Sequence, residues 1–390
     1  MPQANLFRHQ AYTAPRPTSL HRRVTPGRLP PVGSDEFFCR MRRVGEVLRA
    51  QGVAAVYLVH GTFVGPDALG VLAELGRVVP TAAHLLRRVM RRVVETFTGD
   101  AGNYTDRYAR QFQAAINRGG DYPIAVRLFQ WSSENHHLGR ADGAVRLIDE
   151  LAGLELDRGQ RILLWGHSHA GNVFALMTNL LAGNRQAVDR FFQAAEVYYR
   201  WPMLGWVDIP VWNRVRELLS RQRPGWRETP LDLVTFGTPV RYGWDSGGYA
   251  RLLHFINRRP VEGHPDDRAS FPLRLKDVLT AAEGDYVQQL GIAGTNVTPS
   301  VFSWRAWLAD RRLHRLLQAD WPESVAQERF QAGTIIPDEG TTLLVDYGHP
   351  QGRIAEHHAG HAVYTREEWL LFHAEEVARQ FYQTEARRVA

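Results

Sequence analysis

Six short runs of mostly apolar residues divide the chain, and segments with helical spacing lie between several of them. Such runs are typical of strands that are buried on both faces of a sheet. Alternation of strand and helix favours a parallel sheet. The pattern therefore predicts an α/β fold, with a mostly parallel central sheet flanked by helices. The runs are Val53–His60, Tyr122–Trp131, Ile162–Trp165, Leu231–Pro239, Leu252–Asn257 and Thr341–Tyr347.

Helical spacing predicts a helix over Asp35–Ala50, ahead of the first run, and a final helix over Arg366–Thr384. Residues His84–Phe97 alternate apolar pairs with arginine pairs, so this helix would have one apolar and one basic face. A basic amphipathic helix either packs on a sheet or serves as a lid that meets a membrane surface. Packing with a solvated arginine face is the more common arrangement.

The pattern also predicts the domain organisation. Residues 1–34 contain no Asp or Glu and several prolines, as expected for a mobile N-terminal arm. Residues 35–390 are expected to form a single domain with insertions at about 64–120, 184–229 and 258–335, helical in the manner of a cap. The two later insertions are rich in tryptophan. Each either walls an apolar pocket or forms a small core of its own.

Composition narrows the class of protein. In 390 residues, 44% are hydrophobic, which is enough for a sizeable core. No apolar run is long enough to span a bilayer, and no secretory segment is evident. The single cysteine, Cys39, permits no internal disulfide, so a reducing, cytoplasmic location is expected. The net charge is +6, and arginines are scattered among acidic residues, so no nucleic-acid partner is expected.

One segment carries the strongest chemical signal. Gly166-His-Ser-His-Ala-Gly171 connects the run Ile162–Trp165 to an apolar helical stretch that starts near Val173. A strand, a turn of small residues holding one Ser, and a helix are typical of a nucleophile elbow. Ala170 stands where the usual pattern has Gly, but it is still small. The segment predicts Ser168 as a nucleophile, against the alternative of an ordinary serine in a glycine turn.

A second turn fits the same chemistry. His60-Gly61-Thr62-Phe63 follows the run that is expected to lie beside the elbow strand. In serine hydrolases the corresponding turn donates a backbone N–H to the oxyanion of the tetrahedral intermediate. The predicted donors are the N–H groups of Thr62 and of His169, which directly follows Ser168.

These segments resemble the α/β-hydrolase superfamily, particularly its lipase-like esterases. The resemblance is carried by His60–Phe63, Gly166–Gly171, Phe236–Pro239 and Gly360–Tyr364. It implies a Ser–acid–His triad in that chain order and acyl transfer without a cofactor. The implied substrate is a small-molecule ester or a lipid, with transient contact to a membrane surface as a further possibility.

The base and the acid are expected late in the chain. His361 stands just before the final helix, where such enzymes place the base, whereas the other loop histidines are expected at the surface. Related lipases place an Asp where Asn257 stands. Asp285 has the Asp-x-Val form seen after that strand, displaced by an insertion, and is favoured over two rivals. Those rivals are Asp245 and Asp346; the remaining loop histidines are His349, His357 and His358.

Two other functions compete with ester hydrolysis. The pairs His167-x-His169, His136-His137 and His357-His358 offer metal ligands for metal-assisted hydrolysis, although no further metallohydrolase spacing accompanies them. A non-catalytic, hydrolase-like protein that binds a lipid surface is the third hypothesis. The sequence does not specify an oligomeric state.

Overall fold

The computed structural model describes residues 20–62, 103–182, 184–201, 206–221, 229–239, 241–268, 274–292, 296, 298–299, 303–317, 335–350 and 354–383. The helix predicted over His84–Phe97 lies outside these residues, as does most of the first predicted insertion. The prediction of a lid there stays a prediction.

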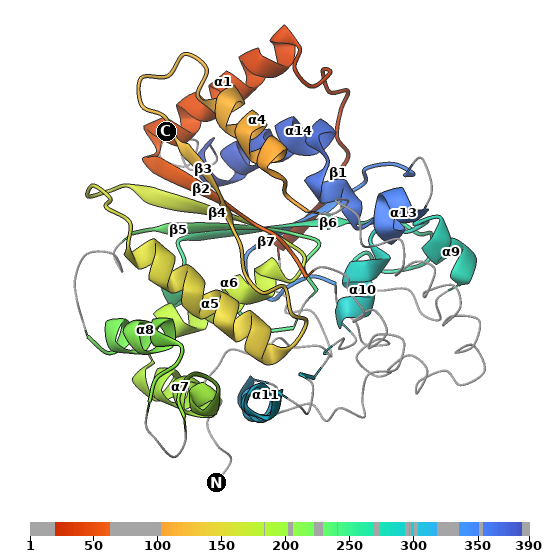
Figure 1. Cartoon of the computed structure of the whole chain (residues 1–390). Coiled ribbons are helices and arrows are strands. Elements are labelled where there is room, and N and C mark those ends of the chain that lie inside the picture. Colours follow the sequence, from red (N-terminus) through yellow and green to blue (C-terminus); the bar gives the residue numbers. More distant parts are fainter. Residues whose placement is uncertain are drawn as a thin grey trace.

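A seven-stranded sheet, parallel throughout, forms the centre of the described part of the chain (Figure 1). Its strand order is β1-β7-β6-β5-β4-β2-β3. The predicted α/β class with a parallel sheet is therefore confirmed. The strands are β1 (Leu20–Val24), β2 (Val53–Val59), β3 (Ala125–Phe129), β4 (Arg161–His167), β5 (Leu231–Phe236), β6 (Arg251–Asn257) and β7 (Thr341–Val345).

Helices cover both faces of the sheet. Figure 1 shows α1, α4 and α14 on one face and α5, α6, α7 and α8 on the other. None of the described helices is long and apolar enough to cross a bilayer. Their bounds are α1 (Asp35–Ala50), α4 (Asp106–Ile116), α5 (His137–Ala152), α6 (Ala170–Leu181), α7 (Arg185–Tyr199), α8 (Pro210–Ser220), α9 (Leu275–Leu279), α10 (Tyr286–Ile292), α11 (Trp304–Leu317), α13 (Ile354–His357) and α14 (Leu370–Ala378). Shorter turns are η2 (Ser246–Gly248), η5 (His358–Gly360), η6 (Ala362–Thr365), η7 (Glu367–Trp369) and the π-turn η8 (Arg379–Gln383).

The apolar runs form strands whose side chains pack into a hydrophobic core on each face of the sheet, as their composition predicts. Successive side chains of a strand point to opposite faces. In β4, Ile162 and Leu164 pack into the core under α5 and α6, whereas Leu163 and Trp165 pack into the core under α1 and α14. All four are almost fully buried. Continuous hydrophobicity, rather than alternation, is therefore what this sheet requires.

The N-terminal arm contributes one strand that the pattern did not predict. Leu20–Val24 forms β1, which pairs in parallel with β7 at the edge of the sheet. Its first four residues are exposed, so it lacks the apolar run that marks the other strands. Backbone hydrogen bonding, rather than side-chain burial, holds this strand.

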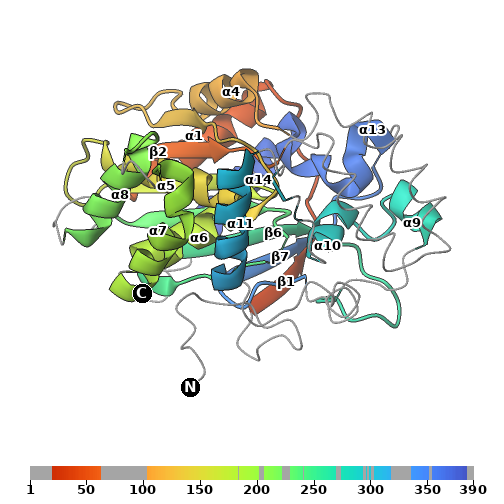
Figure 2. The ribbon, with the colours of Figure 1, turned by 60° about the horizontal axis from the view of Figure 1, so that its bottom comes forward.

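The described part of the second insertion extends the core that lies under α5 and α6, rather than forming a separate one. Trp212 of α8 is fully buried and stacks on Phe191 and Tyr199 of α7. Its indole N–H donates a 2.8 Å hydrogen bond to Asp142 of α5. α11, from the third insertion, packs alongside α7 (Figure 2). Trp212 therefore acts as a packing anchor rather than as a wall of a pocket.

Candidate active site

Ser168 lies in the sharp turn between β4 and α6. Its backbone has φ +55°, a left-handed conformation that a non-glycine residue adopts only when its surroundings enforce it. Two hydrogen bonds do so. The Ser168 N–H donates to the Phe236 carbonyl at 2.8 Å, and the Thr238 hydroxyl donates to the Ser168 carbonyl at 2.7 Å. The turn is therefore held from β5 and the loop that follows it.

The residues around Ser168 must be small because side chains of Phe174 and Thr238 lie close to the backbone there. A Cβ at Gly166 would lie 2.5 Å from the Phe174 ring, and one at Gly171 would overlap the Thr238 side chain. Ala170, the departure from the usual pattern, is fully buried at the start of α6. A methyl group is therefore accommodated at position 170, but not at position 171.

The His60-Gly61-Thr62 turn lies against Ser168. A Cβ at Gly61 would lie 2.5 Å from Ser168 Cβ and 3.2 Å from Ser168 Oγ. Among the described residues, the N–H groups of Thr62 and His169 and the hydroxyl of Ser168 have no hydrogen-bond partner. The turn thus offers two unengaged backbone donors near an unengaged hydroxyl.

Asp285 and His361, far apart in the sequence, form a buried pair. His361 Nδ1 lies 2.7 Å from Asp285 Oδ2, and Asp285 is fully buried. The Tyr364 hydroxyl donates to the same carboxylate oxygen at 3.0 Å, and the Gln288 N–H donates to the other at 2.8 Å. Burial raises the pKa of Tyr364 well above its usual value, so its hydroxyl stays protonated and able to donate. With Nδ1–H bonded to Asp285, His361 Nε2 is left to accept a proton.

Asp285 reaches this position through the end of β6. The Asp285 N–H donates to the Asn257 carbonyl at 2.9 Å, and Gly284 forms an isolated antiparallel bridge with Arg258. Gly284 has φ +118°, and any Cβ there would overlap the Asn257 carbonyl. The inserted segment therefore returns Asp285 to the carboxyl end of β6, next to Asn257.

His167 joins this pair to the serine turn. The ring centroids of His167 and His361 are 4.5 Å apart, and His167 Nε2 donates to the His361 carbonyl at 3.3 Å. No hydrogen bond between Ser168 Oγ and His361 Nε2 is present in the described part of the chain. The three predicted side chains thus come from adjoining loops, and Asp285 and His361 are paired with each other.

The rival acids have other roles in the structure. Asp245 accepts from the Gly247 N–H at 3.0 Å and caps η2. Asp346 accepts from the Gly348 N–H at 2.9 Å in the turn after β7.

The other loop histidines were all predicted to lie at the surface. This prediction is confirmed for His349, which is exposed. It is wrong for His357 and His358, which are buried.

Two buried arginines influence the ring of His169, which directly follows Ser168. Burial, together with the charges of Arg140, Arg241 and His361, lowers the pKa of His169 well below its usual value, so this ring is neutral. It accepts a 3.1 Å hydrogen bond from the Asn172 amide. Arg140 is fully buried, and within the described residues its guanidinium donates to uncharged oxygens, those of Tyr242, Asn135 and Asn296. Such fixed positive charge favours a negative charge that develops nearby.

The histidine pairs do not assemble a metal site in the described part of the chain, where no group of three or more His, Cys, Asp or Glu is arranged to hold a metal ion. The His137 ring bonds to the Tyr242 hydroxyl at 2.7 Å, and the His136 ring accepts from the Gly139 N–H at 2.8 Å. His136 thus caps the N-terminus of α5, and His137, the first residue of this helix, is bonded to Tyr242.

Two residues of the site were not assigned a role from the sequence. Tyr364 lies within the Gly360–Tyr364 segment, but its contact with Asp285 joins residues 79 positions apart. Asn257 stands out in the sequence only because it replaces the expected Asp. No local pattern signals either contact.

No protein-family model, curated protein or solved structure matches this chain.

Proposed function

We propose that this protein is a serine hydrolase of the α/β-hydrolase type that cleaves carboxylic esters. The proposal rests mainly on the contact between the turn that holds Ser168 and the Asp285–His361 pair. A strand–helix turn that holds a serine at φ +55° contacts His361 through the neighbouring His167, and His361 is hydrogen-bonded to the buried Asp285. A hydroxyl becomes an effective nucleophile only when a base takes its proton, and this pair supplies one.

In the proposed reaction, Ser168 Oγ bonds to the acyl carbon as its proton passes to His361 Nε2. This transfer requires Oγ and Nε2 to come within hydrogen-bond distance when substrate binds, a contact that commonly tightens in the substrate complex. The N–H groups of Thr62 and His169 stabilise the oxyanion. Asp285 stabilises the resulting imidazolium, and Tyr364 and Gln288 hold Asp285 in place.

Collapse of the tetrahedral intermediate releases the alcohol, which takes the proton from His361. Water then attacks the acyl-enzyme, gives its proton to His361 and releases the carboxylic acid, as Ser168 regains its hydroxyl hydrogen. No cofactor enters this sequence.

Hydrolysis of a short-chain nitrophenyl ester tests the proposal. Ser168→Ala is expected to lower kcat by at least about 10⁴-fold, because both nucleophile and acyl-enzyme are lost. Ser220→Ala is the control, since Ser220 is an exposed serine at the end of α8. Circular dichroism checks the fold of each variant. A Ser168→Ala protein with the wild-type rate would refute the proposal, and loss of activity on chelation would favour the metal-dependent alternative.

A further inference from the structure

The side chain of His60 bonds to the peptide unit that carries the Thr62 N–H. His60 Nδ1 lies 2.9 Å from the carbonyl oxygen of Gly61. That carbonyl and the Thr62 N–H belong to one planar unit, and in a trans peptide they point in opposite directions. Whatever holds the Gly61 carbonyl therefore also sets the direction of the Thr62 N–H.

Two backbone groups determine where the His60 ring carries its hydrogen. The Gly61 carbonyl can only accept, so Nδ1 must be the donor. The Trp131 backbone N–H can only donate, and it lies 3.4 Å from Nε2, which must therefore accept. Both contacts select the same neutral ring. Burial lowers the pKa of His60, so this neutral form is the one present near pH 7.

Trp131, two residues after β3, holds His60 in place. Its indole N–H donates to the His60 carbonyl at 2.8 Å. The two rings are nearly parallel, with 13° between their planes and 6.0 Å between their centroids. Both residues are buried. Ser133 Oγ, 3.2 Å from His60 Nδ1, is a second acceptor for the same hydrogen. The ring is thus fixed by its neighbours in the protein, without a substrate.

The peptide that His60 holds lies directly against the predicted nucleophile. A Cβ at Gly61 would be 3.2 Å from Ser168 Oγ. A rotation of the Gly61–Thr62 peptide would therefore change the position of the Thr62 N–H relative to an acyl group on Ser168. Donors that are held in place before the reaction stabilise an oxyanion most strongly, because they need no reorganisation.

We propose that His60 is a positioning residue for the oxyanion: it holds the Gly61 carbonyl and thereby aims the Thr62 N–H, and Trp131 holds His60. This inference rests on the proposed function, because an oxyanion forms only in that reaction. His60 acts through the backbone and exchanges no proton with the substrate. It is thus distinct from His361, the proposed base.

Two substitutions of His60 separate positioning from packing. The amide nitrogen of Asn can replace Nδ1 as the donor to Gly61, whereas the amide of Gln takes the place of Nε2. For hydrolysis of a nitrophenyl ester, His60→Asn is expected to keep kcat within about fivefold of wild type. His60→Gln is expected to lower kcat by about 10²-fold and to leave KM within about twofold, since the oxyanion bond forms only in the transition state. A packing role predicts the opposite order, because Gln fills more of the space of His60.

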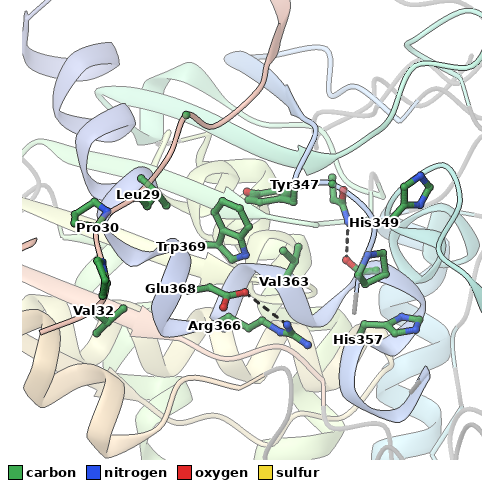
Figure 3. A pocket seen from close by; sticks show the side chains of 16 residues that line it. Leu29, Pro30, Val32, Tyr347, His349, His357, Val363, Arg366, Glu368 and Trp369 are labelled. Carbon is green, nitrogen blue, oxygen red and sulfur yellow. Dashed lines mark hydrogen bonds and ion pairs between the residues drawn. The ribbon is translucent and has the colours of Figure 1, made fainter. Parts of the chain in front are cut away.

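His349→Gln is the matched control and is expected to leave both kcat and KM unchanged. Figure 3 shows His349 at the cavity beside the loop after β7, where this side chain is exposed. Circular dichroism checks the fold of each variant.

Nitrogen-15 NMR of the histidine rings tests the same arrangement in the wild-type protein, without a substrate. The signals that are missing from His60→Asn identify His60, and at pH 7 we expect a hydrogen on Nδ1 and none on Nε2. This measurement decides if a variant fails to fold. A wild-type protein that hydrolyses no ester would refute the proposed function. Hydrolysis by the wild type, together with a hydrogen on Nε2 or with His60→Gln as active as His60→Asn, would overturn the role of His60 alone.

Discussion

At the residue scale, the proposed chemistry depends on the carboxylate of Asp285. Asp285 is fully buried and accepts hydrogen bonds from His361, Tyr364 and the Gln288 N–H. A buried charge that is fully hydrogen-bonded can orient its imidazole partner and stabilise it when it becomes positive. The rival acids Asp245 and Asp346 instead accept from backbone N–H groups of turns.

We therefore expect Asp285→Asn to lower kcat/KM for ester hydrolysis by about 10⁴-fold, because an amide in this place favours the wrong tautomer of His361. Asp245→Asn and Asp346→Asn are matched controls, since an Asn side-chain oxygen can still accept from the same N–H groups. Both are expected to stay within about twofold of the wild-type rate. Initial-rate measurements on the three purified variants check this, and full activity in Asp285→Asn would exclude it as the acid.

At the scale of elements, the serine turn depends on how closely α6 approaches the loop after β5. The Thr238 side chain lies directly against Gly171, and its hydroxyl bonds to the Ser168 carbonyl. Gly237, with φ +57°, approaches Asp285 Oδ2 so closely that a Cβ would lie 2.6 Å away. One loop thus positions both the predicted nucleophile and the predicted acid.

Gly171→Ala is expected to lower the free energy of unfolding by about 1–3 kcal/mol, because its Cβ would displace Thr238. Ester hydrolysis should fall as well, since Thr238 holds Ser168. Urea unfolding and rate measurements check both effects. Gly153→Ala, at the end of α5, is the control: its Cβ would have no neighbour nearer than 3.5 Å. Equal stability of the two variants would show that the close approach at Gly171 is not required.

At the scale of the whole molecule, the sequence predicted the parts that local pattern determines. The apolar runs became strands of one parallel sheet, and the Gly166–Gly171 segment became a strand–helix turn with a strained serine. β1 was missed because Leu20–Val24 is mostly exposed and lacks an apolar run. The position of Asp285 depends on the bridge between Gly284 and Arg258, and the role of Tyr364 on a contact across 79 positions. Such contacts leave no periodic signal.

The core also makes stability depend on pH. Burial lowers the pKa of both His254 and His373 to about 3. In the unfolded chain their pKa is about 6.5. Between these values the unfolded state binds protons that the native state does not. The contribution to stability is therefore complete above pH 6.5 and is lost progressively towards pH 3, by about 1.4 kcal/mol per pH unit for each histidine.

His373→Gln tests this dependence. Glutamine can still accept a hydrogen bond from Tyr347 but does not titrate. Urea unfolding between pH 4.5 and 6 is expected to show a slope for the variant that is less steep by about 1.4 kcal/mol per pH unit. Parallel slopes for variant and wild type would show that His373 is not buried as a neutral ring.

Covalent labelling by a fluorophosphonate shows whether Ser168 is an activated nucleophile. Phosphorus bonds to the serine oxygen as fluoride leaves, so the adduct is stable and can be located by peptide mass spectrometry. We expect one adduct, on the peptide that contains Ser168, which is absent in Ser168→Ala and formed much more slowly in His361→Gln. Absence of labelling in the folded wild-type protein, or an adduct that persists in Ser168→Ala, would contradict it.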